Sequence, residues 1–262
     1  MTVGRRIVGL VVALGAVAGL AGAARAAPVK NIVLVHGAWV DGSGWRPVYD
    51  ILKHDGYDVT IVQQPLSGLE DDVTATRRSL DRQRGPIVLV GHSYGGAIIT
   101  EAGADPRVAA LVYIAAHAPE EGETETGNGK RYPAAGRGAI QKTADGYTYL
   151  DPARYQPDFG ADLPAAEAEF EARAQMLTAA KVFTTPIHNP AWKLKPSWYM
   201  VAGGDRIISP DLERMYAARA HSHLVEVAGA SHSVYRTHPK EIAALIEEAA
   251  RHAGDAQPAA PH

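Results

Sequence analysis

Short runs of β-branched and aliphatic residues alternate with amphipathic stretches along most of this chain. The run at residues 32–35 is followed by apolar positions at helical spacing over residues 45–54, which predicts a strand and then a helix. The same alternation recurs further along the chain. The predicted strands are residues 32–35, 58–63, 87–90, 108–115, 197–202 and 223–228, and the predicted helices are residues 45–54, 69–80, 95–104, one beginning at Pro210 and one carrying Ile242, Leu245, Ile246 and Ala249.

Several of these strands are apolar on both faces, which is typical of parallel strands buried between two layers of helices. Right-handed crossover connections place the intervening helices over both faces of such a sheet. The pattern therefore predicts an α/β fold with a doubly wound, mostly parallel six-stranded sheet.

The alternation stops between the fourth and fifth predicted strands, for nearly eighty residues. A segment of this length is too long for a crossover loop and has few β-branched runs, so residues 119–196 are predicted to be an inserted, mainly helical cap. Ala166, Phe170, Ala174 and Leu177 predict a cap helix that docks by its apolar face. Residues 27–118 and 197–253 are then the core, and the Ala/Pro-rich residues 254–262 are a flexible tail.

The first 26 residues have the pattern of a secretory signal peptide. Arg5 and Arg6 precede an apolar run over residues 7–20, and Ala24 and Ala26 supply small residues for a signal peptidase. The run is shorter than the roughly 20 apolar residues that a membrane span needs. We therefore expect an exported protein, periplasmic or secreted, without stable membrane insertion after cleavage; the paired arginines leave the export route open.

Charge and composition exclude several classes of function. A formal net charge of −3 without a long basic block does not fit a nucleic-acid binder. The absence of cysteine excludes disulfides, thiolate metal sites and a cysteine nucleophile. His221 and His223 have metal-ligand spacing but no third ligand nearby, so no metal and no organic cofactor are expected.

The segment from Gly91 to Gly95 has the form Gly-x-Ser-x-Gly between a predicted strand and a predicted helix. This is the arrangement of a nucleophile elbow, where a sharp turn places the serine in strained backbone angles and glycines leave room around it. The flanking elements make Ser93 the candidate nucleophile at the carboxyl edge of the sheet.

A serine hydroxyl needs a base to take its proton and an acid to orient that base. His232 follows the last predicted strand, where a loop can reach over the sheet edge. Asp205 follows the strand before it, which gives the order serine, acid, histidine. Asp211 and Glu226 are weaker candidates for the acid.

An acyl group under attack also needs backbone N–H donors for its developing negative charge. The residue after the nucleophile, Tyr94, supplies one candidate donor. The loop after the first strand, His36-Gly37-Ala38-Trp39, supplies the other, and Ala38 is its candidate.

The His36-Gly37-Ala38-Trp39 loop and the Gly91-His92-Ser93-Tyr94-Gly95-Gly96 elbow resemble those of the α/β-hydrolase superfamily. Within it they are similar to bacterial esterase-like members related to plant methyl-ester esterases and hydroxynitrile lyases. The resemblance implies the same triad and oxyanion donors. It also implies a sheet that lacks the first two antiparallel strands of the family, with the remaining strands in the family order 4-3-5-6-7-8.

These observations predict a serine hydrolase that cleaves small to medium, apolar or aromatic carboxylic esters through an acyl-enzyme. Trp39, His117, Phe159 and Trp192 are the candidate substrate-binding residues. Lyase relatives carry a lysine where Ser233 follows His232 here, which disfavours lyase chemistry without removing it. Perhydrolase chemistry on the same triad and a non-catalytic receptor that uses the hydrolase pocket stay open as alternatives.

Overall fold

The computed structural model describes residues 1–2, 4 and 27–253. The predicted signal peptide, apart from Met1, Thr2 and Gly4, and the predicted tail at residues 254–262 lie outside the described residues. Within the described residues, no helix has the length and apolar character needed to cross a membrane.

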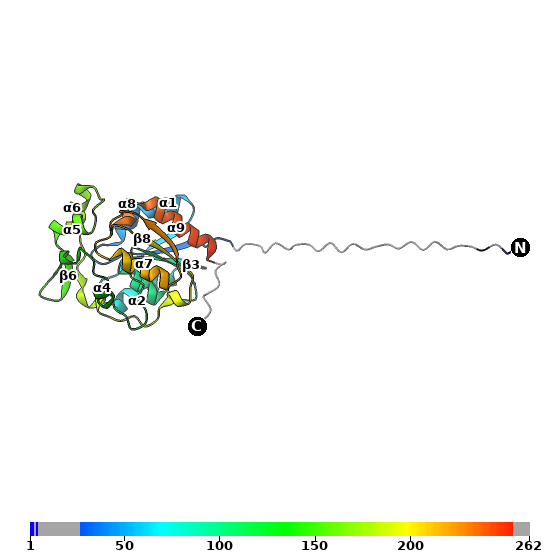
Figure 1. Cartoon of the computed structure of the whole chain (residues 1–262), viewed down its shortest axis with the longest axis horizontal. Helices are drawn as coiled ribbons and strands as arrows, with labels where there is room; N and C mark the ends of the chain where they lie inside the picture. Colours follow the sequence, from blue (N-terminus) through cyan, green and yellow to red (C-terminus); the bar gives the residue numbers. More distant parts are fainter. Residues whose placement is uncertain (3, 5–26, 254–262) are drawn as a thin grey trace.

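The centre of the molecule is a six-stranded parallel sheet in the order β2-β1-β3-β4-β8-β9 (Figure 1). This confirms the predicted doubly wound sheet, and the order is the one that the resemblance implies for a sheet without the two leading strands. Every pairing in it is parallel. The strands are β1 (Asn31–Val35), β2 (Asp58–Ile61), β3 (Ile87–His92), β4 (Val108–Ile114), β8 (Ser197–Ala202) and β9 (His223–Val227).

Helices cover both faces of this sheet because alternate strand residues point to opposite sides. Val33 and Leu89 pack with α2, α3 and α7 on one face, whereas Leu34 and Val90 pack with α1, α8 and α9 on the other. The helices are α1 (Arg46–His54), preceded by the short 3-10 turn η1 (Gly42–Trp45), and then α2 (Leu69–Asp81), α3 (Gly95–Ala102), α7 (Pro210–Arg219), α8 (Val234–Thr237) and α9 (Pro239–His252).

The segment between β4 and β8 contains helices and also a small antiparallel sheet in the order β5-β6-β7. The expectation of a mainly helical segment is therefore only partly correct. Strand β6 alternates half-buried Tyr147 and Tyr149 with buried Thr148 and Leu150, a period of two that indicates a strand. The elements here are α4 (Glu125–Arg131), η2 (Arg137–Ala139), β5 (Ile140–Lys142), β6 (Tyr147–Leu150), α5 (Pro152–Asp158), α6 (Ala165–Arg173), β7 (Thr178–Ala179), η3 (Ala180–Phe183) and η4 (Ala191–Lys193).

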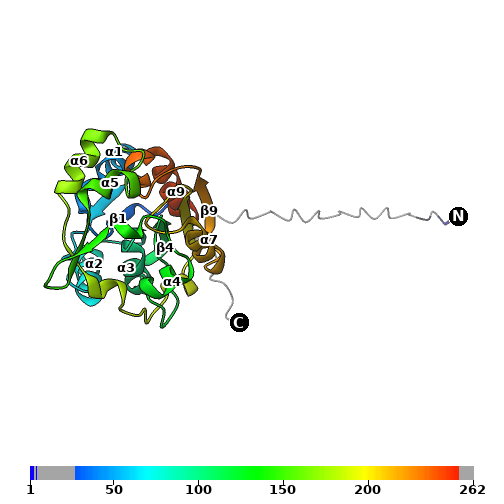
Figure 2. The same cartoon turned by 60° about the vertical axis from the view of Figure 1, so that its left-hand side comes forward.

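The prediction that the cap helix docks by the face carrying Phe170 is wrong. Helix α6 buries Ala168 and Ala172, whereas Phe170 is 72% exposed and Leu177, beyond the helix end, is 49% exposed. Helices α5 and α6 lie together in both views (Figures 1 and 2), and small alanines allow their close approach. The larger aromatic side chains of α5 and its C-terminal end, Tyr155 and Phe159, fill the buried space instead.

Candidate active site

Ser93 lies in the sharp turn between β3 and α3, and its backbone has φ of 55°. This left-handed conformation strains a residue with a side chain and turns the hydroxyl away from the sheet. Neighbouring glycines make the turn sterically possible. A Cβ at Gly91 would lie 2.5 Å from the Gly95 carbonyl oxygen, and one at Gly95 would lie 2.6 Å from the His36 carbonyl oxygen.

Three side chains from three separate loops form one hydrogen-bonded series. The Ser93 hydroxyl lies 2.8 Å from Nε2 of His232, and Nδ1 of His232 lies 2.5 Å from Oδ2 of Asp205. The other oxygen of Asp205 accepts from the backbone N–H groups of Ile207 and Ile208 at 2.7 and 2.9 Å. The carboxylate is thus fixed on both sides, and the histidine is held with its free nitrogen toward the serine.

The two rival acids lie elsewhere. Asp211 and Glu226 both pair with Arg214 at the surface, where they can orient no histidine of this series. The structure therefore brings Ser93, Asp205 and His232 together and leaves the other candidates apart.

Two further buried histidines hydrogen-bond to backbone carbonyls of the loops that form the site. His92 donates from Nε2 to the carbonyl oxygen of His232 at 2.9 Å, and the two rings lie 4.8 Å apart. His36 donates from Nδ1 to the carbonyl oxygen of Gly37 at 2.9 Å. Burial lowers the pKa of His92 well below its ordinary value and lowers that of His36 to about 4, so both rings are neutral at physiological pH. Sequence reasoning gave neither residue this supporting role.

The predicted oxyanion donors lie on the two loops that flank the nucleophile. The first loop lies against the serine, because a Cβ at Gly37 would be 2.7 Å from the Cβ of Ser93. Among the hydrogen bonds of residues 27–253, none uses the backbone N–H of Ala38 or of Tyr94. Both groups therefore stay candidate oxyanion donors, as the sequence predicts.

Ser93 opens into a cavity of about 500 Å³. Trp39 and His117 line this cavity, as predicted for substrate-binding residues, and most of the remaining wall comes from the segment between β4 and β8. The lining residues of that segment are Glu125, Thr126, Gly129, Tyr132, Ala134, Arg137, Ile140, Lys142, Thr148, Ala180, Lys181, Phe183 and Thr184.

The structure does not bring the other two candidate substrate-binding residues, Phe159 and Trp192, into this cavity. Phe159 is fully buried behind the site, with its ring 4.8 Å from that of His232. Trp192 donates its indole N–H to the Pro119 carbonyl oxygen at 3.0 Å, and the Arg219 guanidinium covers its ring. Both aromatics contribute to packing, which apolar content alone could not distinguish from a place in the cavity wall.

The small antiparallel sheet is attached to the loop that carries Ala38. The backbone N–H of Trp39 donates to Oγ1 of Thr178, and its indole N–H donates to Oγ1 of Thr148, both at 3.0 Å. Thr148 in turn donates to the Thr178 carbonyl oxygen at 2.9 Å. Trp39 has φ of 64°, so these bonds hold a strained residue next to a predicted oxyanion donor.

A pair of buried titratable groups in the same cavity was missed at the level of sequence. Nε2 of His117 lies 3.3 Å from Oε2 of Glu125, the first residue of α4. Burial raises the pKa of Glu125 well above its ordinary value, and burial lowers the pKa of His117 to about 3, so burial disfavours the charged form of both groups. No short motif joins the two residues, because their contact depends on how the chain returns over the cavity.

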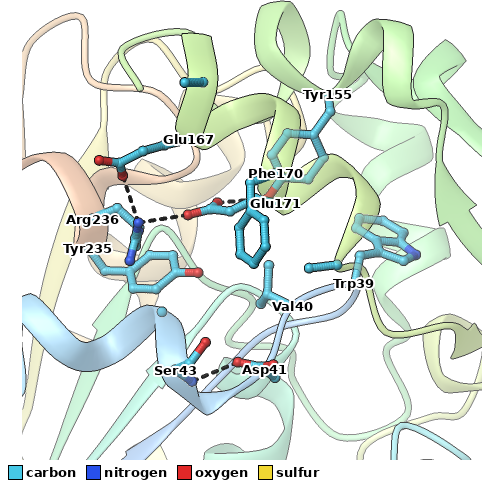
Figure 3. Close-up of a pocket in the computed structure, with 13 residues that line it drawn as sticks. Trp39, Val40, Asp41, Ser43, Tyr155, Glu167, Phe170, Glu171, Tyr235 and Arg236 are labelled. Carbon is cyan, nitrogen blue, oxygen red and sulfur yellow. Dashed lines mark hydrogen bonds and ion pairs between the residues drawn. The ribbon is translucent and has the colours of Figure 1, made fainter. Parts of the chain in front are cut away.

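A second cavity of about 380 Å³ also has Trp39 in its lining (Figure 3). Figure 3 shows the ring of Phe170 pointing toward Val40, beside an ion-paired group in which Arg236 binds Glu167 and Glu171 at 2.8 and 2.9 Å. Its lining includes none of the Ser93, Asp205 and His232 series. This cavity therefore has an aromatic and ionic character and lies apart from the catalytic series.

Within the described part of the chain, no group of three histidine, aspartate or glutamate side chains is placed to hold a metal ion. The expectation that the site works without metal or organic cofactor stays a prediction, which chelation tests.

Comparison with known proteins gives one family and several relatives. The model of the Alpha/beta hydrolase family matches residues 32–245. A carbendazim hydrolyzing esterase from Nocardioides sp. (strain SG-4G) is 36% identical over 111 residues, which are 37% of this chain and 46% of that protein. The chain thus spans less than half the length of this curated relative.

Solved structures share the architecture over nearly their whole length. A pyrethroid hydrolase from Sphingobium faniae JZ-2 is 24% identical, with a TM-score of 0.71, over 85% of this chain and 97% of that one. A methylesterase from Arabidopsis is 18% identical, with a TM-score of 0.72, over 84% of this chain and 98% of that one. At such identities these likenesses establish the fold alone.

Proposed function

Because the chain belongs to the Alpha/beta hydrolase family, we propose that it is a serine esterase whose nucleophile is Ser93. The observation that carries this proposal is the series from Ser93 through His232 to Asp205, with distances of 2.8 and 2.5 Å, at one end of a cavity large enough for a small ester. Esterase relatives at modest identity support a hydrolase that acts on small esters.

In the proposed reaction, the Ser93 oxygen attacks the ester carbonyl carbon while Nε2 of His232 takes the hydroxyl proton. The carbonyl oxygen becomes an oxyanion and receives hydrogen bonds from the N–H groups of Ala38 and Tyr94. Asp205 stabilises the imidazolium that forms. The proton then passes to the departing alkoxide, which leaves as an alcohol, and the acyl group stays on the serine.

Water completes the cycle in the second half of the reaction. His232 takes a proton from water as its oxygen attacks the acyl carbon, the same two N–H groups hold the second oxyanion, and the proton returns to the Ser93 oxygen as the carboxylic acid departs. Each step uses the side chains of Ser93, His232 and Asp205 and two backbone N–H groups, and none requires a metal or an organic cofactor.

The lining of the cavity supports the proposed substrate class. Trp39, Tyr132, Phe183, Ile140 and Leu212 supply aromatic and aliphatic surface, so small to medium esters with an apolar or aromatic part fit the site. Two of the relatives are a carbendazim hydrolyzing esterase and a pyrethroid hydrolase, which supports a small organic molecule as the substrate of this chain.

Two further parts of the proposal concern the chain as a whole. Residues 119–196 act as a cap over the site, since most of the cavity wall comes from them. Export, with a periplasmic or secreted product, rests on the arginine pair, apolar run and small residues of positions 1–26. Sequencing the N-terminus of protein recovered from the producing cells would test cleavage after Ala26.

The decisive experiment measures hydrolysis of p-nitrophenyl esters from acetate to octanoate by the wild type and by Ser93→Ala. We expect turnover by the wild type, a limiting acyl length set by the cavity, and loss of turnover in the variant. Ser67→Ala is the matched control, because it removes an exposed hydroxyl that bonds only to Asp71, and it should keep full activity. A wild type that binds these esters without turning them over would indicate a receptor.

A further inference from the structure

The hydroxyl group of Tyr94, the residue after the nucleophile, is bound by a carboxyl group of α2. It donates to Oδ2 of Asp72 at 2.7 Å, and the other oxygen of Asp72 accepts from the backbone N–H of Leu66 at 2.8 Å. The side chains of all three residues are fully buried. One carboxyl group thus joins the nucleophile elbow to the loop between β2 and α2.

The carboxyl group is costly at this place. Burial raises the pKa of Asp72 to about 6, above the value of about 3.9 for an exposed aspartate, so the folded protein disfavours its charged form. Replacing buried charged groups by well-packed apolar side chains is often neutral or stabilising. Packing of α2 therefore does not account for an aspartate here, whereas the two hydrogen bonds that it accepts do.

These hydrogen bonds act on the peptide group that links Ser93 to Tyr94. The N–H of this peptide group is a candidate oxyanion donor, and Ser93 has the strained φ of 55°. A strained residue keeps its conformation only where the surrounding structure holds it. The Tyr94 ring packs edge-on against Phe183, with 6.1 Å between the ring centroids, and its far end is bound to Asp72. The anchored side chain therefore limits rotation of the peptide group, whose direction an oxyanion site requires.

The same carboxyl group also connects to the loop that carries the other candidate donor. Leu66 has φ of 57°, and its carbonyl oxygen accepts from the backbone N–H of Ala179 in β7 at 2.9 Å. The other residue of β7 accepts from the backbone N–H of Trp39 through its hydroxyl group. A series of hydrogen bonds thus runs from Tyr94 through Asp72 and β7 to Trp39. It links the elbow to the first core loop without passing through the triad.

We propose that Asp72 is a positioning residue of this site, which directs the backbone N–H of Tyr94 toward the oxyanion by holding the Tyr94 hydroxyl and the Leu66 N–H. The inference rests on the proposed esterase function, since an oxyanion forms only if Ser93 attacks a carbonyl group. Asp72 is not among the described residues that line the catalytic cavity, so it acts through Tyr94. Both half-reactions pass through an oxyanion, so loss of positioning lowers kcat and leaves KM nearly unchanged.

Steady-state kinetics on p-nitrophenyl butyrate test the proposal with two single variants and their combination. Tyr94→Phe keeps the ring and removes the hydroxyl, and Asp72→Ala removes the carboxyl group. Each should lower kcat about tenfold and change KM by no more than about twofold, because the donor is misdirected, whereas its removal costs about 10²- to 10³-fold. In the double variant, Tyr94→Phe should add no further loss, because its hydroxyl has already lost the carboxyl partner.

Asp71→Ala is the matched control for Asp72→Ala. It removes the neighbouring carboxylate of the same helix, which is exposed and accepts from the Ser67 hydroxyl, and it should behave as the wild type. Circular dichroism of each variant at the assay temperature measures the folded fraction, by which kcat is corrected.

A pair of inhibitors of equal chain length separates the oxyanion from the stability of the fold. The Ser93 oxygen adds to the carbonyl carbon of trifluoromethyl hexyl ketone, the π electron pair moves onto the carbonyl oxygen, and the proton passes to Nε2 of His232. Methyl hexyl ketone binds without this addition. In Tyr94→Phe and Asp72→Ala, the inhibition constant of the fluorinated ketone should rise about tenfold, and that of the other by no more than about twofold. A variant that is only less stable would keep the ratio of the two constants.

The outcomes distinguish the two proposals. The wild-type kcat in Tyr94→Phe, an equal further loss from Tyr94→Phe in the Asp72→Ala background, or an unchanged ratio of the inhibition constants overturns the role of Asp72 and leaves the esterase intact. Tyr94→Phe decides the question by itself where Asp72→Ala does not fold. Absence of wild-type hydrolysis of every ester, or full activity in Ser93→Ala, overturns the proposed function and the present inference with it.

Discussion

The catalytic cavity has two walls of different character. The core wall reaches the cavity through Ser93 and is backed by Asp205 and His232. The carboxylate of Asp205 accepts three hydrogen bonds, and His232 uses both ring nitrogens. On the wall built by the segment between β4 and β8, Glu125 has a free oxygen and Lys142 and Lys181 form no ion pair among the described residues. The side chains of Asp205 and His232 thus have partners within the protein, whereas the opposite wall presents groups without one among residues 27–253.

This difference indicates a division of tasks. A group whose hydrogen bonds are all made within the protein is held rigidly, as proton transfer and oxyanion binding require. A group without a partner in the free protein gains most from a ligand, which is what selection among substrates requires. We therefore expect changes on the core wall to alter kcat for every ester, and changes on the opposite wall to alter the ratio between esters.

The largest effect should come from the nucleophile and its base. Ser93→Ala and His232→Ala should each lower kcat by on the order of 10⁵-fold, and the double variant should be no worse, because triad members act as a unit. Steady-state kinetics on p-nitrophenyl butyrate measure this. Losses that add in the double variant would argue against a shared proton transfer and would break the contrast between the walls.

Next comes the acid. Asp205→Asn should lower kcat by about 10³- to 10⁴-fold, because an amide no longer fixes the required tautomer of His232. Asp211→Asn, whose carboxylate pairs with Arg214 at the surface, is the matched control and should keep activity. Full activity in Asp205→Asn would transfer the acid to another residue.

A third test measures stability rather than rate and concerns His36, the residue that follows β1. Its pKa in the folded protein is about 4, below the value of about 6.5 for an exposed histidine, so between these values the unfolded chain binds more protons. The stability from keeping this ring neutral is fully present above about pH 6.5 and is lost as the pH falls toward 4. Replacing His36 with Gln should remove about 2 kcal/mol of the pH dependence of unfolding between pH 7 and 4.5.

Urea unfolding of wild type and His36→Gln at several pH values measures that difference. Using the difference between the two proteins cancels the opposing contribution of buried acids such as Asp72, whose pKa burial raises to about 6. Identical pH profiles would show that His36 has the same pKa in the folded and unfolded protein.

A smaller effect is expected where the two walls meet. Trp39→Phe keeps an aromatic ring but removes the indole N–H that donates to Thr148. Loss of this hydrogen bond should cost about 1 kcal/mol of stability. Because the next residue back is the predicted donor Ala38, we expect kcat to fall by roughly threefold to tenfold for all esters alike. A change confined to the preference between esters would place Trp39 with the selecting wall.

Chelation of metal ions should have no effect on activity, and is the last comparison. EDTA should leave the rate on every ester unchanged, because each step of the proposed reaction is assigned to Ser93, His232, Asp205 and two backbone N–H groups. Loss of activity on chelation, restored by zinc, would replace the mechanism on the core wall. Assays before and after dialysis against the chelator decide this.

The sequence predicts the core wall well because local rules control it. Gly91 and Gly95 are required by the steric limits of the turn at Ser93, so the motif itself indicates the elbow. Asp205 and His232 follow successive strands, and parallel strands bring their carboxyl ends to one edge. Their positions along the chain thus already suggest that the side chains meet.

The opposite wall is predicted poorly because distant packing controls it. Phe170 was expected in a buried face, but α6 approaches α5 through Ala168 and Ala172, and only the observed approach of the two helices reveals which face is inside. The contact of His117 with Glu125 joins the segment after β4 to the start of α4. Tyr216 from α7 approaches the other ring nitrogen of the same histidine. No spacing along the chain encodes such a three-way meeting.

The attachment of the small antiparallel sheet to Trp39 also bears on how such proteins can diversify by recombination. Thr148 and Thr178 belong to the inserted segment, yet they bind both N–H groups of a residue in the first core loop. An exchange of residues 119–196 between relatives would carry away these two hydroxyl acceptors and leave the loop beside Ala38 without its anchors. We therefore expect an exchanged insertion to keep this loop in place only where it supplies equivalent acceptors for the two N–H groups of Trp39.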